Sequence, residues 1–262
     1  MRRHRGFIDS DPSRIARIAA LLYLSTVLLG IFSQKLIGDQ LIIDSDPAAT
    51  AANILVHSGL YQLGFAVYMV EMVCNVAMTV LFYVLLKPAG PVVSLMAASF
   101  SFVGCVLKTM SRLFFLMPLF VLDGSRSLHG FDSAQVQSLA LLMTKVNTQG
   151  AAVAMIFFGL YAVLKGVLII NSTFLPRILG IIGILAGFSW LTFLYLPVAY
   201  RVLPYTLALG LLGSASQIGW LLIFGVDDLR WKARATDWER HSANEFESDL
   251  ELRRVERQGR ST

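Results

Sequence analysis

The sequence predicts an all-α fold: a polytopic membrane protein built as a six-transmembrane-helix bundle, with both termini in the cytoplasm. Of the 262 residues, 56% are hydrophobic, and the mean hydropathy is +0.65. Only 15% are charged, against about 25% in a typical soluble domain. The charges gather at the two ends, because residues 18–226 hold just 15 of them. A soluble protein made from that segment would expose an apolar surface and aggregate. A soluble enzyme, a disordered chain and a disulfide-rich secreted scaffold are therefore excluded.

Six apolar runs reach the length of about 20 residues that a helix needs to cross the bilayer core. We expect spans at residues 18–37, 60–86, 92–122, 146–170, 178–196 and 203–226. Helices are expected because each backbone polar group must find its partner within the span. The third run is overlong, which predicts either a tilted helix or a helix end near Pro118.

Two Asp-Pro pairs have the pattern of helix N-termini. Asp11 and Pro12 predict an N-cap and a first helical residue just ahead of the first span. Asp46 and Pro47 repeat the pattern in the following loop. They predict a short helix at the membrane surface over residues 48–57, ending at Gly59.

The polar ends differ in character. Residues 1–17 form a basic N-terminal cytoplasmic segment, which together with the first span indicates a signal anchor rather than a cleaved signal peptide. Residues 227–262 form a charged cytoplasmic tail with eight basic and nine acidic residues. We expect a solvated tail that adds almost no apolar area to the bundle and is dispensable for folding. Aromatic and apolar residues along one helical face would anchor it at the membrane interface: Trp231, Trp238, Phe246 and Leu250. The alternative is a docking segment for a cytoplasmic partner.

The positions of Lys and Arg near the span ends predict the orientation. With the N-terminus inside, twelve basic residues, Lys165 among them, lie on the cytoplasmic side. Only four lie outside: Lys35, Arg126, Lys145 and Arg201. The loop at 38–59 carries three Asp and no Lys or Arg, which fits an external position.

Several kinds of chemistry are not expected from this chain. None of the four histidines lies inside a span, which disfavours a membrane haem protein, a zinc protease and a Ser–His dyad. The sequence contains no phosphate-binding loop of the G-x-x-x-x-G-K-[ST] type. Cys74 and Cys105 both fall within apolar runs, so a disulfide framework is not expected. We expect no catalytic residue, no cofactor and no metal site.

Three ionisable residues lie well inside the apolar spans: Glu71 on the second, Lys108 and Arg112 on the third. Such residues are costly in hydrocarbon, at about 2.5–3.5 kcal/mol each on insertion scales, and normally face the bundle interior or water. Counted from the span centres at 1.5 Å per residue, Glu71 and Lys108 lie at nearly the same depth, with Arg112 about one turn further out. A short turn joins the two spans, so we expect antiparallel neighbours and a Glu71–Lys108 pair.

Polar and small residues continue at helical spacing around this pair, including Tyr68 and Asn75 on the second span. One interpretation is packing, in which small residues let the helices approach and one ion pair links them. The other is a polar cavity for an anion or a small polar solute, because two cations face one carboxylate.

Three segments give the sequence a family resemblance: residues 14–24 (RIARIAALLYL), 46–54 (DPAATAANI) and 83–88 (YVLLKP). With the six-span layout, they resemble an uncharacterised bacterial membrane family, domain of unknown function 4386. The resemblance implies the fold and a membrane location but no activity. Its most specific part is the spacing of Asp46, Thr50 and Asn53. We expect Asp46 to cap the short helix, with Thr50 and Asn53 following on one face. They serve either as local hydrogen-bonding groups or as an external ligand-contact patch.

Three hypotheses of function follow. The first is a bundle with a polar intramembrane pocket that acts in transport or in sensing of an ion or small solute. The second is a structural or regulatory membrane subunit that signals through its cytoplasmic tail, and the third is a membrane enzyme. The expected location is the cell membrane, multi-pass, as in the bacterial cytoplasmic membrane. Expected partners are the lipid bilayer and either a second copy of the chain or a cytoplasmic protein at the tail, but no nucleic acid.

The charge bias generates a test of topology. In a background without the two native cysteines, Ser45→Cys should react with a membrane-impermeant maleimide in intact cells. Ser248→Cys should react only after permeabilisation, because the tail is expected inside. Reaction of both positions in intact cells would contradict the six-span arrangement.

Overall fold

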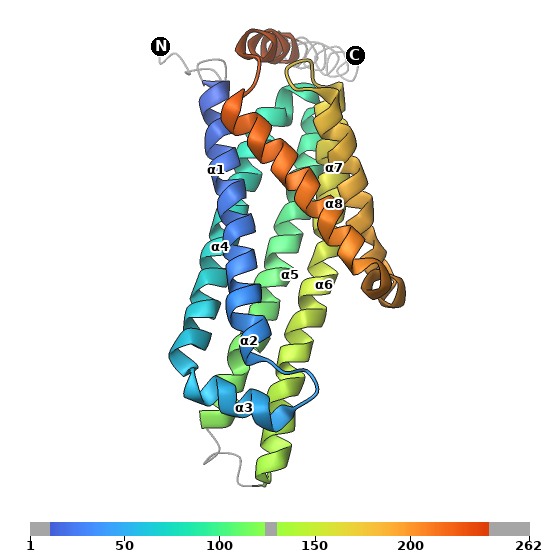
Figure 1. The fold of residues 1–262 in the computed structure, drawn as a ribbon. Helices are drawn as coiled ribbons and strands as arrows, with labels where there is room; N and C mark the ends of the chain where they lie inside the picture. Colours follow the sequence, from blue (N-terminus) through green and yellow to red (C-terminus); the bar gives the residue numbers. More distant parts are fainter. Residues whose placement is uncertain (1–10, 124–129, 241–262) are drawn as a thin grey trace, which may run out of the picture.

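The computed structural model of the protein describes residues 11–123 and 130–240, and these form a helical bundle (Figure 1). Within these residues the structure contains no strand. The helices are α1 (Pro12–Ile31), α2 (Asp39–Leu41), α3 (Pro47–Val56), α4 (Ser58–Leu86), α5 (Pro91–Asp123), α6 (Ser133–Asn171), α7 (Arg177–Trp190) and α8 (Leu196–Ile223). A π-helical segment, Phe32–Gly38, continues α1 into α2, and residues 228–240 are also helical.

Six segments are long and apolar enough to cross a membrane, which confirms the predicted number of spans. They are Pro12–Leu41, Ser58–Ala89, Pro91–Asp123, Ser133–Asn171, Arg177–Leu194 and Leu196–Ile223. Of the two alternatives for the overlong third run, a tilted helix or a helix end near Pro118, the helix end is wrong, because α5 continues through this buried proline to Asp123. Neighbouring helices allow a proline inside a membrane helix, since they and local adjustments satisfy the freed backbone groups.

The largest differences from the predicted spans are at the starts of α6 and α8, which begin 13 and 7 residues before their apolar runs. Helix α6 starts at Ser133 rather than near residue 146, because Asp132 and Gln135 form a reciprocal capping box. The side chain of Asp132 accepts from the Gln135 backbone N–H (2.8 Å), and Gln135 Oε1 accepts from the Asp132 N–H (3.0 Å). Helix α8 starts at Leu196 with a proline in its first turn, the position where a missing N–H does no harm. The apolar run therefore indicated the part of each helix that fits the bilayer but not its full length.

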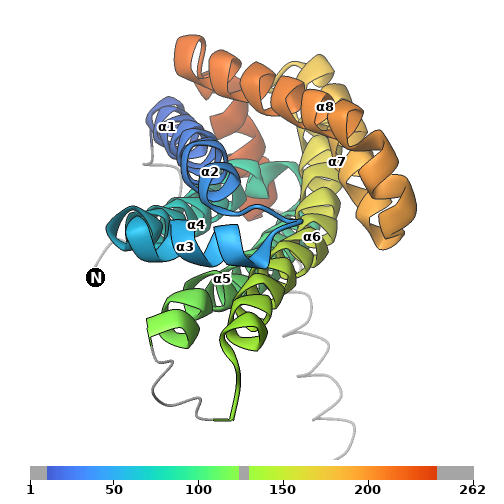
Figure 2. The same ribbon diagram turned by 60° about the horizontal axis from the view of Figure 1, so that its bottom comes forward.

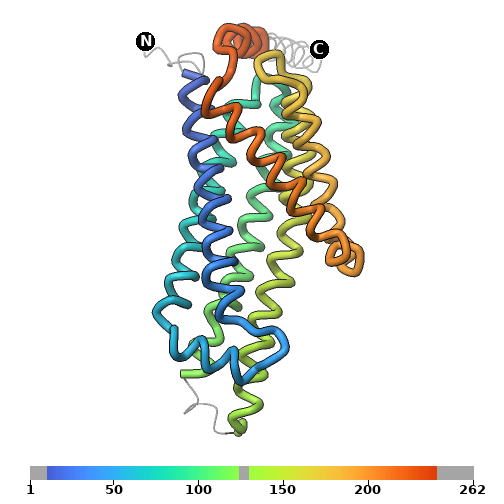
Figure 3. Tube along the Cα trace, in the orientation of Figure 1, coloured from blue at the N-terminus to red at the C-terminus, as the bar shows by residue number. Residues whose placement is uncertain are grey.

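The helices differ in length, and this sets the shape of the bundle. The span Arg177–Leu194 has 18 residues, about 27 Å at 1.5 Å per residue, close to the thickness of a bilayer core of about 30 Å. Helices α5 and α6 are much longer and extend beyond the α7–α8 turn (Figures 1 and 2). Helix α3 lies across their extended end, whereas α1 begins at the opposite end, beside residues 228–240 (Figure 3).

Glycines bring α6 and α7 into direct backbone contact. A Cβ added at Gly166 would lie 2.7 Å from the Gly180 carbonyl oxygen, and one added at Gly159 would lie 2.9 Å from that of Gly187. No larger side chain fits at these positions without moving a helix. The glycines of the fifth span are therefore used for close packing against the fourth.

The short helix predicted over residues 48–57 is present as α3 over Pro47–Val56, but it does not end at Gly59. Asp46 caps α3 by accepting from the Ala49 N–H (3.0 Å), but α3 ends at Val56, and Gly59 already lies inside α4. His57 lies between the two helices with φ of −111° and ψ of 36°. The chain therefore turns at His57 without needing a glycine.

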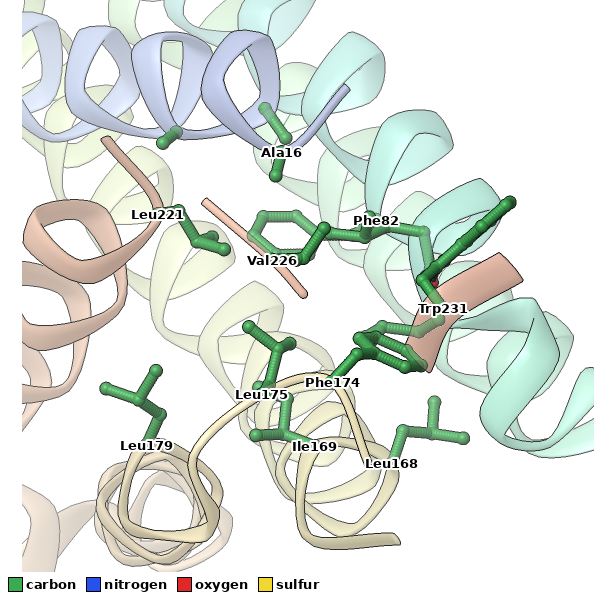
Figure 4. Close-up of a cluster of buried hydrophobic side chains, with 14 of the residues drawn as sticks. Ala16, Phe82, Leu168, Ile169, Phe174, Leu175, Leu179, Leu221, Val226 and Trp231 are labelled. Atoms are coloured by element: carbon green, nitrogen blue, oxygen red, sulfur yellow. Dashed lines mark hydrogen bonds between the residues drawn. The ribbon is translucent and has the colours of Figure 1, made fainter. Parts of the chain in front are cut away.

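The expectation that the tail adds no apolar area to the bundle is wrong for residues 228–240. Trp231 and Ala235 are both 0% exposed and belong to the largest buried cluster, which also contains Phe82, Leu168 and Phe174 (Figure 4). The indole Nε1 of Trp231 donates a 2.8 Å hydrogen bond to the Leu85 carbonyl near the end of α4. Phe246 and Leu250 lie outside the described residues.

Polar contacts hold the same helix against three other segments. After α8, Gly225 adopts a positive φ of 66°, which turns the chain back toward the bundle. Ser13 at the start of α1 then donates from its hydroxyl to Asp228 Oδ1 (2.8 Å), and the Asp227 N–H donates to the Phe174 carbonyl (3.2 Å). The Lys87 Nζ lies 4.4 Å from the ring centroid of Trp238. Residues 228–240 are thus part of the folded unit.

Trp231→Ala is expected to reduce the free energy of unfolding by about 3–5 kcal/mol, the usual range for removing a buried aromatic side chain. Thermal unfolding in detergent measures it, with Leu229→Ala as the control because Leu229 is 83% exposed on the same helix. Truncation after Val226 should destabilise the protein as well, whereas truncation after Arg240 should leave the Tm nearly unchanged. Equal Tm values for the two truncations would mean that the buried tryptophan contributes nothing.

Candidate functional site

The centre of the candidate site is an ion pair between α4 and α5. Lys108 Nζ lies 2.5 Å from Glu71 Oε1, and the two side chains are 13% and 4% exposed. This is the pair that the matched depths on neighbouring spans predict. Helix α1 approaches from a third side, since a Cβ added at Gly30 would lie 3.3 Å from Glu71 Oε1. Within the described residues, Glu71 Oε2 has no hydrogen-bond partner.

The ion pair is one rung of a polar ladder along the α4–α5 interface. Its members pair at intervals of three or four residues on each antiparallel helix. The rungs are Thr79 with Ser101 (oxygens 2.7 Å apart), Asn75 with Cys105 (3.4 Å), Glu71 with Lys108, and Tyr68 with Arg112 (guanidinium 3.6 Å from the ring centroid). Because each rung depends on the same register, the ladder fixes how α4 and α5 are placed along one another.

The guanidinium of Arg112 contacts an aromatic ring and an amide oxygen instead of a carboxylate. Its side chain stacks over Tyr68 and donates from Nη1 to Asn147 Oδ1 of α6 (3.0 Å), and the residue is 4% exposed. Nε of Arg112 has no partner among the described residues. The Tyr68 hydroxyl in turn donates to Gln34 Oε1 (3.0 Å). A buried cation with a free N–H and no carboxylate in contact is suited to an anion.

A cavity of about 650 Å³ adjoins this cluster. This volume lies within the range of about 300–1,000 Å³ that is typical of small-molecule sites. One side is polar and comes from α4, α5 and the segment after α1: Gln34, Tyr68, Glu71, Asn75, Lys108 and Arg112. The opposite side is apolar and comes from α6, α7, the turn after it and α8: Met155, Phe158, Trp190, Phe193, Leu203 and Leu207. All five residues proposed from the sequence for the pocket therefore line one cavity.

The charges around the cavity do not balance. Four cations line it (Lys35, Lys108, Arg112 and Lys165) and two carboxylates (Asp39 and Glu71). Lys35 and Asp39 pair with each other at 2.6 Å at an exposed position. Lys108 pairs with Glu71, which leaves the buried basic residues Arg112 and Lys165 without a carboxylate among the cavity residues, so the potential favours an anion.

Lys165 is a cavity residue that the sequence reasoning assigned elsewhere. It was counted among cytoplasmic charges, but it is 2% exposed and lines the cavity. Its Nζ lies 4.6–4.9 Å from the ring centroids of Phe82, Tyr23 and Tyr161, a geometry in which rings attract a cation. Without it the cytoplasmic side still has eleven basic residues against four. The sequence did contain a signal for this position. Lys165 lies five residues inside the predicted span, and Tyr161, one helical turn before it, is an aromatic residue that could contact a buried lysine.

The element Asp46, Thr50 and Asn53 does not line this cavity. Thr50 is 0% exposed, and its hydroxyl both accepts from the Ile43 N–H (2.9 Å) and donates to the Ile43 carbonyl (3.0 Å). Asn53 Nδ2 donates to the Leu41 carbonyl (3.4 Å). These contacts fasten the preceding loop to α3.

The described residues contain no cluster of three or more His, Cys, Asp or Glu side chains that could hold a metal ion. Cys74 and Cys105 are free thiols. The chemistry available at the cavity is therefore that of its amines, guanidinium, carboxylates, hydroxyls and amides, which suits the binding of a charged or polar molecule.

Six apolar helices around a charged cavity define a multi-pass membrane protein. The chain belongs to the family described as Domain of unknown function (DUF4386), whose model matches residues 18–225. No curated protein and no solved structure matches it. The family match spans the bundle from α1 to the end of α8, so the cavity lies wholly within the family region.

Glu71→Gln or Lys108→Met alone should destabilise the protein, by about 3–5 kcal/mol, because each leaves a buried charge without its partner. The double variant should recover much of that loss. Thermal or denaturant unfolding of the four proteins in detergent gives the coupling energy. Additive losses would mean that the two side chains do not stabilise one another.

Proposed function

We propose that this protein binds a small anion in its intramembrane cavity and acts in transport or sensing of that solute. The observation that carries the proposal is the charge of the cavity: beside the Glu71–Lys108 pair, two buried basic residues, Arg112 and Lys165, have no carboxylate in contact among the described residues. Burial of unpaired cations is costly in a membrane protein and usually reflects a functional need. In keeping with the orientation expected from the Lys and Arg bias, the proposed location is the bacterial cytoplasmic membrane.

The position of the cavity supports access from the side opposite the termini. Gln34, Lys35 and Asp39 line it, and they lie beyond the end of α1. The Lys35 and Asp39 side chains are 67% and 39% exposed, so that end of the cavity reaches a polar surface. At the other end, Lys165 is enclosed by aromatic rings and the bundle is closed by the cluster around Trp231. A site open to one side at a time is what alternating access or sensing requires.

A second candidate function is a regulatory subunit that signals through its C-terminal segment. The observation in its favour is the docking of residues 228–240, which contact the start of α1, the end of α4 and the α6–α7 loop. These contacts give a cytoplasmic partner an ordered surface to bind. The two functions are compatible if occupancy of the cavity is the signal.

Thiol labelling tests the anion-binding proposal. In a background without the two native cysteines, Asn75→Cys places a thiol at the cavity wall. An anionic ethylsulfonate thiosulfonate reagent should modify it at least ~10-fold faster than a cationic trimethylammonium reagent of the same size, because the local potential concentrates anions. Rates are measured in proteoliposomes.

Two variants serve as controls. Val73→Cys lies on the same helix but is 70% exposed on the outside of the bundle and does not line the cavity, so it should react poorly with both reagents. Arg112→Gln added to Asn75→Cys should reduce the preference for the anionic reagent. Equal rates for the two reagents at Asn75→Cys would overturn the proposal.

A further inference from the structure

We propose that the ligand is an anionic amphiphile drawn from the membrane, whose head group binds at Lys108 and Arg112 and whose alkyl chain leaves the cavity between α1 and α8. This inference rests on the proposed function and names the class of anion. It follows from three features of the cavity: its two unlike walls, its sideways opening and its level in the bilayer.

The two walls separate charge from apolar surface. The charged groups come from the segment after α1, from α4 and α5, and from Lys165 of α6. The facing wall presents Met155, Trp190, Phe193, Leu203 and Leu207 and, apart from the Tyr200 hydroxyl of α8, no ionisable side chain. An inorganic anion would use only the first wall and leave the second in contact with water. A molecule with a charged head and an alkyl chain matches both.

The cavity opens sideways because α8 tilts away from α1. Toward the end of the bundle where α1 begins and α8 ends, the two helices are joined by a hydrogen bond between the Tyr23 hydroxyl and Ser214 Oγ (2.9 Å). Further along they diverge, and α5 and α6 are visible between them in Figure 1. Ile31 of α1 and Leu207 of α8 both line the cavity and are 46% and 44% exposed. Apolar residues thus form both edges of the opening, which suits an alkyl chain passing into lipid and not a hydrated ion.

The head-group site lies in the half of α5 that is farther from its start at Pro91. Arg112 is 21 positions after Pro91, where α5 begins, a rise of about 32 Å. This is close to the length of the shortest span, about 27 Å for 18 residues. Lys108 lies about one turn deeper. The head group of an amphiphile in the leaflet on that side lies nearer to this depth than one in the other leaflet, so sideways entry moves its charge through the shorter distance of hydrocarbon.

Binding of radiolabelled dodecyl phosphate to the full chain in lipid nanodiscs tests the inference, with empty nanodiscs subtracted. Saturable binding is expected, at least ~10-fold tighter than that of methyl phosphate, because the chain adds buried apolar contact. Dodecyltrimethylammonium, with the same chain and the opposite charge, should not compete. Arg112→Gln should weaken binding at least ~10-fold.

Two matched tryptophan variants test the opening. Leu207→Trp should block the edge and weaken dodecyl phosphate binding at least ~10-fold. Leu211→Trp should leave binding unchanged, because Leu211 lies one turn further along α8, is 49% exposed and does not line the cavity. Equal thermal stability of the two variants shows that a loss at Leu207 comes from the opening and not from misfolding.

The outcomes separate the two proposals. If methyl phosphate binds as tightly as dodecyl phosphate, and binding still depends on Arg112, the cavity binds anions but the amphiphile inference is wrong. The same holds if Leu207→Trp and Leu211→Trp bind dodecyl phosphate equally well. If neither phosphate binds saturably to the wild-type chain, both proposals fail.

Discussion

Charge burial at the Glu71–Lys108 contact is the constraint on which the rest of the bundle depends. Leaving either charge alone in a low-dielectric interior is costly, which favours the register of α4 and α5 in which the two atoms lie 2.5 Å apart. The same register aligns the other rungs of the ladder, and it places Arg112 over Tyr68 and beside Asn147 of α6. The ion pair thereby positions the cation that has no carboxylate of its own. The cavity exists on that side because α8 leans away from α1 instead of filling the space (Figure 1).

Much of the fold could be predicted because it depends on features that are local in sequence. Long apolar runs locate the spans, and Asp11 and Asp46 mark two helix starts through side-chain caps at 3.1 and 3.0 Å. The tail was predicted wrongly for the same reason. Its high density of charge indicated solvent exposure. The sequence around Trp231 does not show that the turn at Gly225 brings this side chain into contact with the end of α4. In a short amphipathic helix, one buried aromatic can outweigh many solvated charges.

The residues of the candidate site also fall into two groups, those that the sequence could predict and those that it could not. Residues on adjacent, antiparallel spans could be paired by depth alone, which is how Glu71, Lys108 and Arg112 were found. Gln34, Asn147 and Lys165 come from the π-helical segment after α1 and from α6, whose rotation and contacts with α4 and α5 are set by tertiary packing. Hydropathy gives the depth of a residue but not the direction in which its side chain points. A lysine near a span end is therefore easily taken for a topology signal when it lines the interior.

The cavity and the docked C-terminal helix share one set of contacts, which links the two candidate functions. Trp231 lies in the buried cluster with Phe82 and binds the Leu85 carbonyl one turn further along α4. The Phe82 ring also lies 4.6 Å from Lys165 Nζ, and Lys165 lines the cavity. Lys165 moving toward a bound anion would change its contact with Phe82, which packs in the same cluster as the tryptophan. Such coupling requires that the C-terminal helix over residues 228–240 has two arrangements, and that both the cavity ligand and the bound partner favour one of them. The position of Phe82 between the cavity and Trp231 makes it the residue at which that coupling would be decided.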